Sequence, residues 1–144
     1  MSTLWFVVAH RAGARIFEQQ GREEPMLKEE IFHPAGRLKT AELDSDRPGV
    51  SYESVRPGVH ALANEEWAHD KSAREFAHTL AGRLDKARTQ QHLHGIVLVA
   101  EPKFLGLLRQ ALSRESEKLV RGTVAKDLAA EPTAALSARL PELW

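Results

Sequence analysis

The segment His94–Leu112, HGIVLVAEPKFLGLLRQAL, decides the fold class because its hydrophobic pattern changes halfway along it. The part His94–Ala100 carries an unbroken apolar run, which is typical of a strand covered on both faces. Pro102 then stands near a helix start, and the following apolar residues fall on one helical face. A buried strand that leads into an amphipathic helix indicates an α/β protein.

The residues on either side of this segment continue the alternation of helix and strand. We expect a helix over Glu66–Gln91, capped at Asn64, then a strand over Leu119–Ala125 and a closing helix over Pro132–Leu140 that Pro141 stops. One apolar stripe runs along the first of these helices at three- and four-residue steps. Its members are Trp67, Ala73, Phe76, Ala77, Leu80, Leu84 and Ala87.

The first third of the chain predicts three strands joined by short turns. They span Leu4–Ala9, Ala14–Glu18 and Met26–His33, and Gly13 is placed to take a positive φ in the first turn. The complete order is β-β-β-(long loop)-α-β-α-β-α. This order predicts one α/β domain over residues 1–144, with a mixed five-stranded sheet and helices packed on it.

Bulk composition narrows the classes of function. The chain has 144 residues, with 20 basic and 20 acidic side chains and no cysteine, so nucleic-acid binding would need a local basic patch. Leu4–Ala9 is too short to be a signal-peptide core or a membrane span, and no stretch of eighteen apolar residues occurs. We therefore expect a soluble, cytoplasmic protein. Trp144 is either a docking anchor or a dimer contact.

Residues 34–65 carry neither a helical nor a strand period, and contain Arg-Pro-Gly-Val twice, at Arg47–Val50 and Arg56–Val59. Proline followed by glycine favours type II turns, and a loop of this length in a compact domain is usually functional. Arginine and lysine side chains can contact phosphates, and a tyrosine can stack on a base. The predicted binding residues are Arg37, Lys39, Arg47, Tyr52, Arg56 and His60.

Acidic residues in the same segment leave a second interpretation open. Glu42, Asp44, Asp46 and Glu53 formally cancel the basic charge. The loop can therefore be an ordered one that its own ion pairs hold, without any ligand. Binding of RNA, the ribosome or a protein partner is the alternative.

No pattern indicates catalysis or a metal. None of the seven histidines forms a helical His-x-x-x-His pair, and the His92/His94 spacing is more typical of polar residues at a helix–strand turn. A two-metal nuclease needs converging carboxylates near the first strand, where the first two strands offer only Glu18. Nucleophile-elbow and phosphate-loop motifs are absent from the sequence. We therefore predict no catalytic residue, no metal and no cofactor.

Four stretches together resemble a bacterial family, the host attachment proteins, also described as proteins required for attachment to host cells. They are WFVVAHRAGARIFEQQG, HPAGRLKTAELDSDRPG, IVLVAEPKFLGLLRQAL and LVRGTVAKDL, which follow one another over nearly the whole chain. Members of that family commonly have an aspartate where this chain has His10. The family in turn resembles the middle domain of archaeal and eukaryotic peptide-chain release factors, and this implies an RNase H-like topology.

The resemblance also implies a place for the function. In the release factors, the loop between the third strand and first helix carries Gly-Gly-Gln, and residues 34–65 occupy the equivalent place here without that motif. Peptidyl-tRNA hydrolysis is therefore not carried over. We predict a non-catalytic module that binds RNA, the ribosome or a protein through this loop. The alternative is the attachment or envelope-associated role in the family name, and a hydrolase using His10 or His60 ranks last.

Overall fold

A computed structural model describes residues 2–34, 59–90 and 93–144, with the side chains of residues 59–69 excepted. Five strands and four helices are described in this part of the chain. They are β1 (Thr3–His10), β2 (Gly13–Gln20), β3 (Met26–Phe32), α2 (Val59–Gln90), β4 (Gly95–Val99), α3 (Pro102–Ala111), α4 (Arg114–Lys118), β5 (Val120–Val124) and α5 (Thr133–Leu143).

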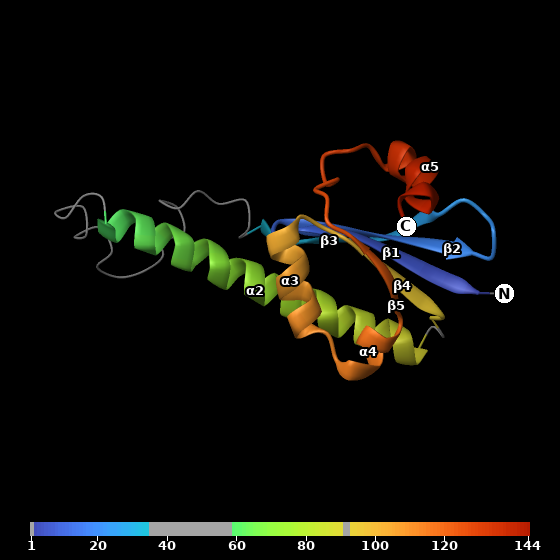
Figure 1. Cartoon of the computed structure of the whole chain (residues 1–144), viewed down its shortest axis with the longest axis horizontal. Helices are drawn as coiled ribbons and strands as arrows, with labels where there is room; N and C mark the ends of the chain where they lie inside the picture. Colours follow the sequence, from blue (N-terminus) through green and yellow to red (C-terminus); the bar gives the residue numbers. More distant parts are fainter. Residues whose placement is uncertain (1, 35–58, 91–92) are drawn as a thin grey trace.

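The strands form one sheet in the order β3-β2-β1-β4-β5 (Figure 1). β1 pairs antiparallel with β2, and β2 with β3, whereas β1–β4 and β4–β5 are parallel. Three consecutive hairpin strands followed by two parallel crossover strands give the RNase H-like arrangement. The predicted α/β class and the mixed five-stranded sheet are confirmed.

Helices cover both faces of the sheet. α2, α3 and α4 lie on one face and α5 lies on the other (Figure 1). Trp5 and Phe76 are fully buried in the core between the sheet and α2, as the sequence predicts, and Phe6 belongs to the core beneath α5. The side chain of Trp67 lies outside the described residues. The expected helical stripe is otherwise confirmed, since its members from Ala73 to Ala87 are buried.

The predicted start of the long helix is wrong. α2 begins at Val59 instead of Glu66, so Asn64 lies inside the helix and His60 belongs to its first turn rather than to a loop. The physical reason is that Gly58 is the last glycine or proline before Gly82, and alanine, leucine and glutamate between them are good helix formers. The predicted loop is shorter at this end by seven residues, 59–65.

Pro141 does not stop the last helix, which continues through it to Leu143. A proline loses one backbone hydrogen bond in a helix, but only two helical residues, Glu142 and Leu143, follow it here. Leu140 of α5 is fully buried and Leu143 packs on the same apolar cluster, so burial of apolar surface holds the end of the helix in place.

Gly13 also differs from its prediction. Among the described glycines only Gly21 has a positive φ, of 59°. Gly13 is instead required by a close approach, since a Cβ atom there would lie 2.9 Å from the backbone oxygen of Ile31 in β3.

Candidate functional site

The carboxyl ends of β1, β4 and β5 meet at one edge of the sheet, and α2, which packs on one face of the sheet, extends past this edge (Figure 1). Open α/β sheets bind ligands outside the carboxyl ends of their strands. This edge is therefore the first place to look for a site. The end of β3 lies there too. His33, the residue after β3, contacts Ser72 of α2.

Four charged side chains come together there, and we call them the carboxyl-end cluster: Arg11, Asp70, Arg74 and Lys103. Arg11 follows β1, Asp70 and Arg74 belong to α2, and Lys103 stands in the first turn of α3. The Lys103 ammonium lies 2.9 Å from the Asp70 carboxylate. Arg74 and Arg11 are near enough for their charges to act on the same carboxylate, so the four side chains together carry three positive charges and one negative charge.

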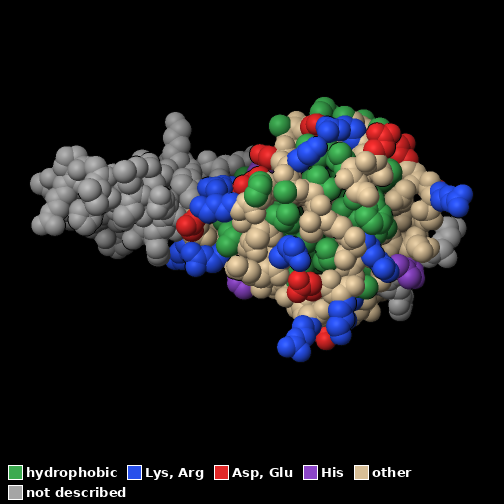
Figure 2. Space-filling model, viewed as in Figure 1, with side chains coloured by type: hydrophobic (Ala, Val, Ile, Leu, Met, Phe, Trp, Pro, Cys, Tyr) green, Lys and Arg blue, Asp and Glu red, His purple; other side chains and the backbone are tan. Residues whose placement is uncertain are grey.

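The charges of the cluster affect the pKa of the Asp70 carboxyl. The hydrogen bond from Lys103 lowers the pKa of the Asp70 carboxyl, and the charges of Lys103, Arg74 and Arg11 lower the pKa further. Asp70 is therefore ionised at neutral pH, and it neutralises only one of the three cations. Figure 2 shows Lys and Arg side chains beside Asp and Glu where the described body meets the grey residues.

The start of α3 is well defined, and this fixes the backbone of Lys103. Glu101 is the N-cap, and its carboxylate accepts the backbone N–H groups of Phe104 at 2.7 Å and Lys103 at 3.1 Å. Pro102 occupies the first turn, where its missing N–H costs nothing. The cap therefore sets the point from which the lysine side chain reaches Asp70.

A stack of rings fixes α2 against its neighbours beside the cluster. The ring of His33 lies 5.0 Å from that of Phe76, nearly parallel, and its Nε2 atom is 3.0 Å from the hydroxyl of Ser72. The ring of Phe76 in turn lies 5.9 Å from that of Phe104 in α3. The end of β3, α2 and α3 are thus joined through one aromatic column.

A small cavity of about 180 Å³ lies at the same edge, beside the β1–β2 turn, and His10, Arg15, Glu30 and Phe32 contribute to its lining. Ligand pockets usually measure roughly 300–1,000 Å³, so this one is small for a ligand. Arg15 donates to the backbone oxygens of Ala129 at 2.9 Å and Glu131 at 2.8 Å. Its guanidinium therefore holds the connection between β5 and α5.

Most of the predicted binding residues lie outside the described part of the chain. They are Arg37, Lys39, Arg47, Tyr52 and Arg56, all within residues 35–58. His60 lies in α2, and its side chain is not described. The structure therefore tests none of these six predictions.

His10 and His94 each accept a hydrogen bond from a nearby backbone N–H group. The Nδ1 atom of His10 accepts the backbone N–H of Ala12 at 3.2 Å, and that of His94 accepts the N–H of Thr3 at 2.9 Å. Among the residues whose side chains are described, 2–34, 70–90 and 93–144, no three histidine, aspartate or glutamate side chains gather to hold a metal ion. None of the helices described there is long and apolar enough to cross a membrane.

Sequence reasoning missed the carboxyl-end cluster, although a signal for it exists. Arg11 directly follows the first strand and Lys103 closely follows the fourth, and the carboxyl ends of parallel strands share an edge. Arg74 lies on the polar face of a predicted helix, where a basic residue is unremarkable. Only the path of α2 past this edge brings Arg74 to the other two residues.

A family model matches residues 5–140, and its description is "protein required for attachment to host cells". The chain belongs to this family. The match includes the whole carboxyl-end cluster and all of the sheet except Thr3 and Leu4 of β1. The resemblance stated from the sequence is thereby confirmed for the attachment family.

Other comparisons add little to this membership. A solved structure named "archaeal protein" has 13% identity and a TM-score of 0.48 and covers 95% of this chain, but the chain spans only 34% of that protein. A likeness at this level carries no argument about function. None of the curated proteins matches the chain. The resemblance to release factors therefore stays a prediction from the sequence.

Proposed function

We propose that the protein serves attachment to host cells as a non-catalytic binding protein, with the carboxyl-end cluster as part of its contact surface. The observation that carries this proposal is the family match over residues 5–140, which covers nearly the whole domain. The cluster supports a binding role because the Lys103–Asp70 ion pair leaves Arg11 and Arg74 as two further cations among its four side chains. An anionic partner would complement that charge.

Deletion of the gene from its bacterium tests the proposal. Attachment to cultured host cells should fall in the deletion strain, and the wild-type chain supplied in trans should restore it. Attachment that is unchanged by deletion would overturn the proposal. The expected cytoplasmic location bears on how the protein acts. If fractionation finds the chain only in the cytosol, its part in attachment is indirect, and if the chain is found at the surface, direct contact with the host is supported.

Binding of RNA or the ribosome is the second candidate function. The positive excess of the cluster favours it, as does the sequence that follows Pro34, where Arg37, Lys39, Arg47 and Arg56 occur. Co-sedimentation of the purified protein with ribosomes should then weaken with salt and also in the variant Arg47→Ala/Arg56→Ala. Equal co-sedimentation of that variant and the wild type would count against this candidate.

A further inference from the structure

The second feature that can hold a ligand lies at the opposite end of the sheet, and we call it the amino-end trough. It is about 390 Å³ in volume, within the usual range of ligand sites. It opens beside the amino ends of β1 and β4, close to the end of α5. Its walls include Ser2, Leu4, Gln19, His94, Arg121 and Trp144.

Two glycines make room for the side chains of the trough. A Cβ atom on Gly95 would lie 2.7 Å from Cγ of Arg121 and 2.8 Å from Cδ1 of Leu4. A Cβ atom on Gly122 would lie 3.2 Å from Cε3 of Trp144. Both glycines therefore allow a long side chain to lie flat on the sheet, one an arginine and the other a tryptophan.

A bulge in β5 directs the side chain of Arg121 toward the trough. Ile96 pairs with Val120 and Val97 pairs with Gly122, so Arg121 is an extra residue in β5. A bulge of this kind turns the side chain of the extra residue away from its regular direction. Here the guanidinium turns back over β4, where Nη2 and Nε donate to the backbone oxygen of His94 at 2.7 Å and 3.2 Å.

Hydrogen-bonding groups remain available around the trough. The backbone N–H of Thr3 donates to Nδ1 of His94, so the proton of the neutral imidazole is on Nε2, which can donate. Arg121 uses Nε and Nη2 within the chain and retains Nη1. The amide nitrogen of Gln19 donates to the backbone oxygen of Glu23 at 2.7 Å, which leaves the amide oxygen as an acceptor.

The aromatic wall is half open. Trp144 is 51% exposed, although its ring meets that of Phe6 edge-on at 6.4 Å between centroids. A tryptophan held from one side presents a rigid apolar surface with a polar N–H at its rim. The ligand therefore needs one apolar face and several polar groups at its edge.

Charge decides which ligand class fits. Among the side chains of the described residues that line the trough, that of Arg121 is the one from a lysine or arginine, and no aspartate or glutamate side chain joins it. One cation complements a single carboxylate, whereas a phosphate monoester carries roughly −1.5 to −2 at neutral pH. A sugar ring has an apolar face of C–H groups and hydroxyls at its edge. We propose that the trough binds a sugar residue with one carboxylate, of the hexuronate class.

The test is a titration of the full-length chain with methyl glucuronide, a mimic of a linked sugar acid, followed through the tryptophan indole N–H signals in ¹H–¹⁵N spectra. The signal lost in Trp144→Phe identifies the indole of that residue. Methyl glucuronide should move this signal and bind roughly tenfold or more tightly than neutral methyl glucoside, because an arginine–carboxylate bond is lost with the neutral sugar. A parallel titration with free glucuronic acid shows whether the trough binds the free sugar acid or its glycoside more tightly.

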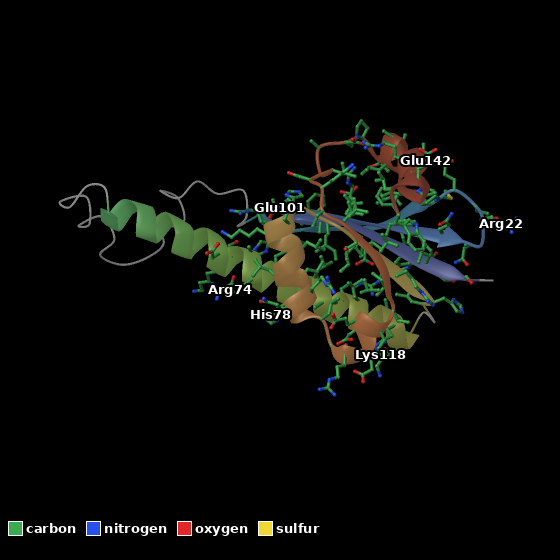
Figure 3. All side chains as sticks on the ribbon, in the orientation of Figure 1. Arg22, Arg74, His78, Glu101, Lys118 and Glu142 are labelled. Atoms are coloured by element: carbon green, nitrogen blue, oxygen red, sulfur yellow. The ribbon has the colours of Figure 1, made fainter. Side chains whose placement is uncertain are left out.

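Two arginine variants, one in the trough and one outside it, provide the test and its control. Arg121→Gln should lose roughly tenfold or more of the affinity. Arg22→Gln changes an exposed arginine in the β2–β3 connection near the same end of the molecule (Figure 3) and should bind like the wild type. Equal thermal midpoints establish that both variants fold.

Three outcomes would overturn the inference: no movement of the Trp144 signal, equal affinity for glucuronide and glucoside, or preference for uridine monophosphate. The inference rests on the trough alone, so its failure leaves the attachment role untouched, and loss of attachment on gene deletion does not establish it.

Discussion

Asp85 shows how a single polar residue joins two helices. Its carboxylate accepts the hydroxyls of Ser113 at 2.5 Å and of Ser116 at 2.6 Å, and Ser116 is fully buried. These hydrogen bonds lower the pKa of the Asp85 carboxyl. α4 is therefore attached to α2 through one ionised group.

Replacing Asp85 by alanine should lower the free energy of unfolding by about 2 kcal/mol, because two hydroxyls lose a charged partner and one of them is buried. Urea unfolding followed by circular dichroism measures the change. Gln90→Ala, at an exposed position of the same helix, is the control and should change the free energy little. Equal stability of the two variants would show that the carboxylate does not hold α4.

Acid should weaken the fold through the carboxylates with lowered pKa. Hydrogen bonds from Arg83, Lys103 and Ser113 are the largest causes at Glu29, Asp70 and Asp85, respectively. A carboxyl whose pKa is lower in the folded state stabilises that state above its unfolded pKa of about 4. The stabilisation is lost as the pH falls through the folded pKa.

The free energy of unfolding should accordingly decrease when the pH is lowered from about 5 to about 2.5. Arg83→Gln removes the main cause of the shift at Glu29 and should make this decrease smaller. Urea titrations at each pH provide the measurement. An identical pH dependence in the variant and the wild type would contradict the role given to Arg83.

At the scale of elements, two glycines differ in whether the packing around them leaves room for a side chain. Gly106 lies in α3 with no atom within 4 Å of a Cβ position, whereas a Cβ on Gly13 would meet Ile31 of β3. Gly106→Ala should raise the free energy of unfolding by about 0.5–1 kcal/mol, since alanine favours the helix. Gly13→Ala should lower it, because β3 must move away. Chemical denaturation of the two variants gives the signs, and a stabilising Gly13→Ala would contradict the described β2–β3 packing.

Most elements could be predicted from the sequence, and their ends could not. The stripe around Phe76 and the apolar run of β4 both carry a clear period, so the helix and the strand are predictable. The start of α2 at Val59 was missed because Asn64 also resembles a cap. α4 was missed because five residues form it and Asp85, far along the chain, holds it.

At the scale of the whole molecule, the sheet places two surfaces at its opposite ends, although the residues of each surface are scattered along the sequence. The carboxyl-end cluster and the amino-end trough lie at opposite ends of β1, and each combines residues from distant parts of the chain. Arg11 and Lys103 are 92 positions apart and meet Arg74 only in the fold. The residues of such sites meet only in the folded chain, so a sequence pattern alone does not predict them. The predicted loop residues lie outside the described structure, and they stay predictions.

The most direct test of the proposed function combines charge reversal with the attachment assay. The deletion strain would receive one of two variants. Arg11→Glu/Arg74→Glu reverses two charges of the carboxyl-end cluster. Arg114→Glu/Lys118→Glu is the control, because it reverses two exposed charges of α4, which lies away from the cluster (Figure 3). Both variants should accumulate and melt like the wild type. Host-cell attachment should stay low with the cluster variant and return to the wild-type level with the α4 variant. Full restoration by the cluster variant would contradict the claim that the carboxyl-end cluster contacts the partner.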